Sequence, residues 1–517
     1  MSTTSDESYL TSNQTKLETV RSLAPRRRYK KTKAACRTCR TRKIRCDETL
    51  PFCNNCTRTG RICDGVTDSP ARPKEVRFKA PLTLSNFRPS QLGSSFGQDE
   101  VFYLGLFRSR FIYTIVGWDA SPKQAWMRLI LQAVHEEESL SHAIIAFSAL
   151  NDDTRNESNA DNRFALHHYG KCIASLRCIF DQDHSRYINV ALLCSLFCIC
   201  FELRMREPSL AQTHLEHSLN VLASSFASVE DEVATAFARL DLQASIYLGA
   251  RPPALDLGRI RSIKPSYESL YQEADEVLVE LDAKLYTFLR TTANKYRYIE
   301  PGSIPLEILA KQHDLEAQFQ DYHDKYLALD ASFMNAAPRM TQEQESLLTI
   351  KYLTAVHTLA ASLYAEETIY DRFSSEFITI VDLSADILNK KTCRDGTFLL
   401  DMGVIHPLYM VATKCRCPMT RRRAISLLHN FPGVEGVWDG APNARVAEVI
   451  MRREEEGLGY DADNWDITRT WVIPEWRRIH AADIYPDAKG RRATVYLRWL
   501  PNGLDGGWED AREDFTW

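Results

Sequence analysis

Six cysteines fall within the 28 residues from Cys36 to Cys63, with the spacing C-x2-C-x6-C-x6-C-x2-C-x6-C. The stretch is an internal repeat, because Cys36–Cys46 and Cys53–Cys63 share the pattern C-x2-C-x6-C. Thiolates are soft ligands that suit Zn²⁺ in a tetrahedral site. Two separate sites of this kind need eight sulfur contacts, so six cysteines suffice only if two of them bridge both ions. The spacing therefore predicts a two-zinc cluster made of two related halves.

The rest of the chain favours a compartment in which these thiols stay reduced. The first 20 residues, MSTTSDESYLTSNQTKLETV, are polar and contain no apolar secretory segment. The most apolar run, VALLCSLFCICF at 190–201, is shorter than the roughly 20 residues that a membrane span needs. We therefore expect a buried core helix there, an intracellular protein and no membrane partner. In that setting a dense cysteine cluster favours metal binding over disulfides.

Basic residues surround the cysteines. Residues 26–63 contain thirteen Lys and Arg against Asp47 and Glu48, a net charge of +11, whereas residues 64–517 carry a net charge of −14. Six thiolates and two Zn²⁺ together add −2, so the head remains strongly cationic. A small basic head on a large acidic body predicts that the head binds a polyanion.

The cysteine stretch resembles the fungal Zn2Cys6 binuclear-cluster DNA-binding domain. The resemblance rests on the cysteine spacing, on the basic insert RTRKIR between the second and third cysteines, and on Pro51 before the fourth. It implies that two Zn²⁺ are bound and that the first and fourth cysteines, Cys36 and Cys53, bridge them. The implied zinc ligands are Cys36, Cys39, Cys46, Cys53, Cys56 and Cys63.

The same resemblance implies that the polyanion is double-stranded DNA and indicates how the head contacts it. A short helix enters the major groove, where Lys43, with Arg42 beside it, reads guanine O6 and N7 in a CGG-like triplet. Other basic residues are expected to neutralise phosphates; these are Arg40, Arg45, Arg26, Arg27 and Arg28. The arm RRRYKKTK that contains the last three is either also a nuclear-import signal or only a solvated tail.

The domain organisation follows from composition and periodicity. Residues 1–25 are expected to be disordered, 26–66 to form the basic arm and the cluster, and 67–98 to form a linker with four prolines and no sustained period. Those prolines would break a coiled coil, so the linker gives no support for dimerisation. The protein is expected either to bind DNA as a monomer or to form a homodimer through its large domain.

Helical periodicity dominates residues 99–500, which predicts an α-helical regulatory domain. One helix is expected to have Ser121 as its N-cap and Pro122 at its first position. Near the end, TWVIPEWRRIHAADI and RRATVYLRWL flank YPDAKG and predict a β-hairpin. The predicted fold is thus a small Zn2Cys6 binuclear zinc cluster, joined by a linker to a mainly all-α helical domain with a C-terminal β-hairpin. LILQAVHEEESLSHAIIAFSAL and RRRAISLLHNFPGVEGVWDG loosely resemble the regulatory domain that follows fungal zinc clusters.

Three other features of the body invite a functional interpretation. The histidines of HLEH (214–217) and the pair at 167–168 could bind metal, but no further ligand motif accompanies them, which favours structural or surface roles. The cysteines within 194–200 favour inert packing over redox sensing. The tail PNGLDGGWEDAREDFTW, 501–517, is either a disordered activation segment or a solvated end whose tryptophans pack on the hairpin.

The sequence therefore predicts a nuclear, zinc-dependent, sequence-specific DNA-binding transcription factor that acts with RNA polymerase II and is not an enzyme. The resemblance suggests a pathway-specific regulator of a metabolic gene cluster, for example one for a secondary metabolite. Its expected partners are CGG-like sites in the DNA major groove and the transcription machinery or coactivators. One alternative is an enzyme in the helical body tethered to DNA, although no P-loop, Rossmann or GxSxG motif occurs. Zinc buffering is the other, and the long helical body argues against it.

Overall fold

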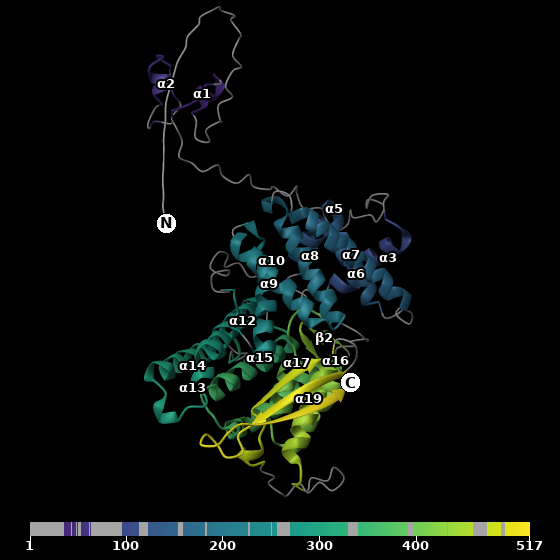
Figure 1. Cartoon of the computed structure of the whole chain (residues 1–517), viewed down its shortest axis with the longest axis vertical. Coiled ribbons are helices and arrows are strands. Elements are labelled where there is room, and N and C mark those ends of the chain that lie inside the picture. Colours follow the sequence, from purple (N-terminus) through teal and green to yellow (C-terminus); the bar gives the residue numbers. More distant parts are fainter. Residues whose placement is uncertain are drawn as a thin grey trace, which may run out of the picture. The chain divides into compact units, whose positions relative to one another are not determined.

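The computed structural model divides the chain into two compact units, Met1–Leu82 and Thr83–Trp517. Their boundary falls within the predicted linker. We call the first unit the head and the second the body (Figure 1). The structure describes residues 36–42, 44–47, 49, 53–61, 63, 96–112, 123–152, 159–180, 184–225, 228–249, 251–255, 269–328, 340–390, 398–431, 433–458, 473–487 and 492–517. The predicted N-terminal segment, the basic arm and the prolines of the linker lie outside these residues.

Among its described residues, the head has two short helices, α1 (Arg37–Thr41) and α2 (Asn54–Thr57). Each begins directly after a cysteine, Cys36 or Cys53, so the sequence repeat is also a structural repeat. The six cysteines are the buried cluster of this unit within its described residues. A segment this small buries too little apolar surface to fold without a metal or a disulfide.

The first part of the body is a set of helices around two apolar ones. In α6 every residue from Ser139 to Leu150 is buried, and α8 contains the apolar run at 190–201, which packs in the same core. By length and composition Tyr187–Arg204 could cross a membrane, but most of it is buried inside the protein. The expected helix start at Ser121 and Pro122 lies outside the described residues. The elements are α3 (Gln98–Leu106), η3 (Phe107–Phe111), α5 (Lys123–Glu136), α6 (Glu138–Leu150), α7 (Asn159–Phe180), α8 (His184–Arg204), α9 (Pro208–Ser225) and α10 (Asp231–Leu248).

The second part of the body holds two further cores. One joins α12, α14 and α15, and the other joins α15, α16, α17, α18 and α19. Gly436 turns the chain between two short strands with φ near 54°, and a Cβ there would collide with the Gln243 side chain. The elements are α12 (Leu270–Phe288), η5 (Leu289–Ala293), α13 (Asn294–Tyr296), η6 (Pro301–Ser303), α14 (Leu306–Tyr326), α15 (Gln342–Ala361), η7 (Glu367–Phe373), α16 (Ser374–Lys390), β1 (Phe398–Leu399), α17 (Ile405–Lys414), α18 (Pro418–His429), β2 (Val434–Glu435), β3 (Trp438–Asp439) and α19 (Gly440–Glu455).

The chain ends in an antiparallel sheet that packs on α19, drawn in yellow in Figure 1. After η8 (Glu475–Arg477), strand β4 (Ala481–Pro486) pairs with β5 (Arg492–Trp499), which confirms the predicted hairpin. Buried and more exposed residues alternate along β5, so one face of the sheet meets the helix while the other meets solvent.

The tail 501–517 supplies the third strand of this sheet. Strand β6 (Glu509–Thr516) pairs with the whole of β5, Phe515 is 9% exposed, and Trp517 packs against the same core as α19. Trp508 meets the ring of Tyr298 edge-on at 4.8 Å. Of the two hypotheses for the tail, the structure agrees with packing and contradicts a disordered segment. The acidic residues of β6 are solvated because they occupy an edge strand with one wet face.

Candidate zinc centre and DNA-contacting residues

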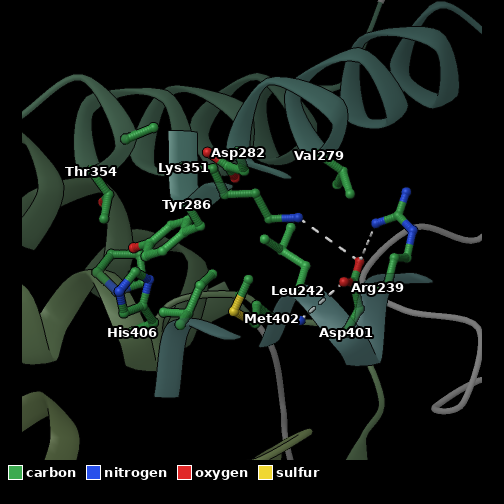
Figure 2. Close-up of a pocket in the computed structure, with 14 residues that line it drawn as sticks. Arg239, Leu242, Val279, Asp282, Tyr286, Lys351, Thr354, Asp401, Met402 and His406 are labelled. Carbon is green, nitrogen blue, oxygen red and sulfur yellow. Dashed lines mark hydrogen bonds and ion pairs between the residues drawn. The ribbon is translucent and has the colours of Figure 1, made fainter. Parts of the chain in front are cut away.

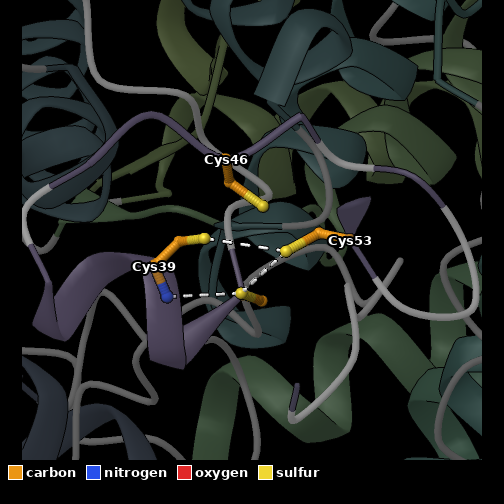
Figure 3. A group of neighbouring side chains, drawn as sticks. Cys39, Cys46 and Cys53 are labelled. Carbon is orange, nitrogen blue, oxygen red and sulfur yellow. Dashed lines mark hydrogen bonds between the residues drawn. The ribbon is translucent and has the colours of Figure 1, made fainter. Parts of the chain in front are cut away.

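The six cysteines of the head bring their sulfurs into one small volume. Cys36 Sγ lies 3.6 Å from Cys53 Sγ and 3.8 Å from Cys56 Sγ, and Cys39 Sγ lies 3.6 Å from Cys53 Sγ. Figure 3 shows the sulfurs of Cys39, Cys46 and Cys53 turned toward one another. All six side chains are buried, so the functional cluster is also the core of the head.

Two groups of four sulfurs can be separated within this cluster. In each group, all four sulfurs lie within 4.8 Å of one another. The groups are Cys36, Cys39, Cys46 and Cys53, and Cys36, Cys53, Cys56 and Cys63. They share Cys36 and Cys53, so six cysteines supply two complete sets of four donors.

The donor set and its spacing fit zinc. In a tetrahedral site with Zn–S bonds of about 2.3 Å, neighbouring sulfurs lie about 3.8 Å apart, close to the distances of 3.6 Å between Cys39 and Cys53 in one group and 3.8 Å between Cys36 and Cys56 in the other. Burial raises the pKa of the Cys36 thiol to about 12, so a cation must lie beside the sulfurs if they are to be thiolates at neutral pH. The six cysteines are thus positioned to bind two zinc ions.

Asp47 supports the second half of the cluster, a role that its charge alone did not indicate. Its Oδ2 accepts hydrogen bonds from the Thr49 hydroxyl at 2.6 Å and from the Asn54 amide at 3.0 Å, at the first residue of α2. These hydrogen bonds lower the pKa of the Asp47 carboxyl to about 2. A carboxylate at a helix start satisfies amides that have no partner inside the helix.

Two of the expected DNA-contacting arginines lie between the halves of the head. Arg42 Nη1 donates to Thr59 Oγ1 at 3.2 Å, so this side chain links the first half to the second. Asn55 Nδ2 donates to the Arg45 carbonyl at 2.8 Å, while the Arg45 residue itself is exposed. The structure thus gives Arg42 a partner within the head and leaves the Arg45 residue in solvent.

The remaining expected DNA contacts are not placed by the structure. Lys43 and residues 26–28 lie outside the described residues, and for Arg40 the backbone alone is described. Pro51 also lies outside them. The assignment of Lys43 to base reading, and of the other basic residues to phosphates, stays a prediction.

The histidines singled out in the body do not come together in one site. His214 Nδ1 lies 2.7 Å from Glu202 Oε1, while His217 is exposed, so this pair does not converge on one site. His167 is exposed, but His168 is buried and its Nδ1 lies 3.1 Å from Nδ1 of His142. No sequence motif pointed to His142, because its proximity to His168 depends on the packing of two helices.

The cysteines of α8 behave as packing residues. Cys194, Cys198 and Cys200 are fully buried, and burial raises the pKa of the Cys194 thiol well above its usual range. A thiol with a raised pKa carries little nucleophilic thiolate. The expectation of inert packing therefore agrees with their surroundings.

A small cavity in the body is lined by residues of α10, α12 and α15, by the segment before α17 and by the first turn of α17 (Figure 2). Arg239 forms ion pairs with Asp275 at 2.7 Å and Asp401 at 3.0 Å, and Lys351 pairs with Asp275 at 2.9 Å. Burial raises the pKa of the nearby Asp282 carboxyl to about 8. The cavity measures about 30 Å³, room for one or two water molecules rather than for a metabolite.

Comparison with known proteins places the cysteine cluster in a family. Residues 34–73 match the family model of the fungal Zn(2)-Cys(6) binuclear cluster domain. A transcription regulator specific to the aspercryptin biosynthesis cluster of Emericella nidulans is 20% identical over 564 aligned residues, which cover 86% of this chain and 90% of that protein. No solved structure matches the chain.

Shorter matches are closer in sequence. The transcriptional regulatory protein moc3 of Schizosaccharomyces pombe is 38% identical over 93 residues, 17% of this chain and 18% of that protein. A Zn(2)-C6 fungal-type transcription factor of Gibberella zeae is 52% identical over 42 residues, 8% of each chain. The spacing, the sulfur geometry and the family match agree: at residues 34–73 this chain carries a fungal Zn(2)-Cys(6) binuclear cluster domain, as in fungal transcription regulators of this type.

Proposed function

We propose that this protein is a nuclear transcription factor that binds specific DNA sites through its two-zinc head and regulates RNA polymerase II promoters. The observation that carries the proposal is the pair of four-sulfur groups that share Cys36 and Cys53. These two residues would bridge the zinc ions, and the loaded cluster would hold α1 and its basic insert in the orientation that DNA binding requires.

Within the head, the basic residues divide between two tasks. Lys43 reads guanine in a CGG-like triplet, and Arg45, Arg40 and residues 26–28 bind phosphates. Arg42 has a structural role as well. Its hydrogen bond to Thr59 positions the second half of the cluster against the first. Its contribution to DNA binding is then partly indirect.

The target genes proposed here belong to a biosynthetic gene cluster. The support is a relative whose name describes a regulator specific to such a cluster and which aligns with 86% of this chain. The body, rather than the head alone, would then carry the contacts with the transcription machinery. No observation among the described residues favours the DNA-tethered enzyme.

Genome-wide occupancy mapping in the native host tests the proposal. Wild-type protein should occupy a limited set of promoters that share CGG-like triplets. Cys53→Ser should abolish this occupancy because it removes a donor from both four-sulfur groups at once. Cys417→Ser is the matched control, since Cys417 is an exposed cysteine of the body, and it should leave the occupancy unchanged. Equal occupancy by wild type and Cys53→Ser would refute the proposed role of the head.

A further inference from the structure

Three metal-binding side chains meet in the body, far along the chain from the cysteine cluster. Glu100 lies on α3, His142 on α6 and His168 on α7, and one donor atom from each falls within 4.8 Å of the other two. Both histidines are buried, at 6% and 2% exposed, and the Glu100 side chain is 16% exposed. Such a convergence of two imidazoles and a carboxylate from three helices has no part in the DNA-binding role of the head.

The two rings present the same nitrogen to each other. Nδ1 of His142 and Nδ1 of His168 are 3.1 Å apart. Two nitrogen ligands of a tetrahedral zinc, each about 2.0–2.1 Å from the metal, lie about 3.3 Å from each other. One ion beside this pair can therefore reach both nitrogens with little change in the position of either ring.

Carboxylates lie on the outer side of both rings. Nε2 of His168 is 3.4 Å from Glu100 Oε1, and Nε2 of His142 is 3.7 Å from Glu138 Oε1. Metal-bound histidines usually direct their second nitrogen at a carboxylate or carbonyl, which fixes the ring and raises its basicity. Glu100 is itself held in place, because its Oε2 accepts the Gly97 amide at 2.6 Å.

The surroundings keep both imidazoles neutral and dry. Phe164 packs against the His168 ring with 4.6 Å between centroids, and Phe96 lies edge-on to His142 at 6.3 Å. Burial lowers the pKa of His168 to about 4 and also lowers the pKa of His142. Protons therefore compete weakly with a metal ion for these nitrogens at neutral pH.

We propose that His142 and His168 bind, through their Nδ1 atoms, a third divalent transition metal ion of the Zn²⁺ type, separate from the two ions of the head, and that Glu100 orients the His168 ring from its Nε2 side. The two nitrogens leave the other coordination positions to water. Metal binding shifts the proton that otherwise lies between the two Nδ1 atoms to Nε2 of the same ring, on the side where Glu100 or Glu138 lies. The ion would link α6 to α7, and Glu100 would link α3 to the same site. The competing arrangement is a metal-free N–H···N hydrogen bond between the two rings.

Native mass spectrometry of the full-length protein with saturating Zn²⁺ decides between these arrangements. Wild type should carry three zinc ions per chain. His168→Phe, which keeps a ring against Phe164 but removes both nitrogens, should carry two. His217→Ala, which changes an exposed histidine of α9, should still carry three. Two ions in wild type, or three in His168→Phe, would overturn the proposal.

A second variant tests the proposal even if His168→Phe fails to fold. Glu100→Gln keeps the shape of the side chain and its hydrogen bond to the Gly97 amide, because Gln also serves at this position of a capping box. It should lower the affinity for the third zinc at least tenfold while the two zinc ions of the head remain. Cobalt substitution gives an independent readout: the third Co²⁺ should add ligand-field bands without further sulfur-to-cobalt charge transfer. An unchanged third-zinc affinity in Glu100→Gln, or new charge-transfer intensity with the third ion, would contradict the assignment.

Discussion

The head and the body of this protein are each stabilised by different interactions. The head is organised by six sulfurs that lie within 28 residues of sequence, and these sulfurs are its buried cluster within the described residues. The part of the body that the structure describes has four apolar cores and buried ion pairs between residues far apart in the chain, such as Arg239 with Asp401. One unit therefore depends on metal, and the other on packing and buried charge.

Because of this difference, DNA binding and the folding stability of the body should depend on different residues. A change at the cysteines should remove DNA binding and leave the body folded, whereas a change in the buried charges should weaken the body and leave the zinc content of the head intact. Four experiments, in order of decreasing expected effect, test or refine this separation.

Removal of zinc should have the largest effect. A strong chelator should unfold the head completely, because the cysteine cluster is its core. Amide hydrogen exchange in residues 36–63 should then rise to the rate of an unfolded chain, while the cores of α6, α8 and α15 stay protected. Loss of protection in α15, or persistent protection in the head, would contradict the separation between the two units.

The features that could be predicted from the sequence are local ones, such as those of the head, whereas features that depend on long-range packing in the body could not. The cysteine ligands were predictable because the spacing that defines them is local, and the β4–β5 hairpin was predictable from its alternating pattern. Strand β6 was not, because its acidic residues face solvent and resemble a disordered tail until their pairing with β5 is known. The contact between His142 and His168 depends on helix packing, for which a single sequence carries no signal.

A buried carboxylate provides the next test. Burial alone would raise the pKa of Glu367, but Lys414 at 2.7 Å, Arg297 at 2.9 Å and Arg416 at 3.7 Å outweigh it and lower that pKa to about 2. Glu367→Gln leaves these cations without their shared partner and should cost about 3–5 kcal/mol at pH 7. Glu366→Gln, at an exposed neighbouring position, should cost little. Denaturant unfolding of the full-length protein measures both.

The same residue sets a pH dependence. Since the pKa in the folded protein is below the ordinary value of 4.5, the folded state binds fewer protons, and the stabilisation is complete above pH 4.5. It should be lost as the pH falls from about 4.5 to about 2, and Glu367→Gln should flatten the stability curve in that interval. Zinc content at pH 7 should not change in this variant. An unaltered slope would exclude Glu367 as a source of acid sensitivity.

The third test concerns the tail, where the packed strand replaces the hypothesis of a disordered activation segment. Phe515 belongs to the core between the sheet and α19, so Phe515→Ala should cost about 3 kcal/mol of body stability. Asp510→Asn changes an exposed ion pair with Arg498 and should cost less than about 1 kcal/mol. Residues 501–517 fused to an unrelated DNA-binding domain should fail to activate a reporter. An active fusion, together with an undiminished stability of Phe515→Ala, would restore the activation hypothesis.

The smallest expected effects lie within the head and separate base reading from phosphate binding. Lys43→Ala should weaken binding to the preferred site by about 1–3 kcal/mol and reduce discrimination at one base pair. Arg45→Ala, at an exposed residue, should weaken preferred and random DNA alike and lower the salt dependence of binding by about one counterion. Titrations of both DNA types at several salt concentrations give these quantities directly.

Arg42→Ala refines this last test, because Arg42 already donates to Thr59 within the head. If it mainly joins the two halves, the variant should lower the zinc affinity or the thermal stability of the head in the absence of DNA. If it mainly contacts DNA, zinc affinity should match that of wild type and only DNA binding should fall. A loss of zinc affinity in Arg45→Ala of the same size would remove the distinction between the two arginines. The head would then respond to the loss of either positive charge rather than to the loss of one specific link between its halves.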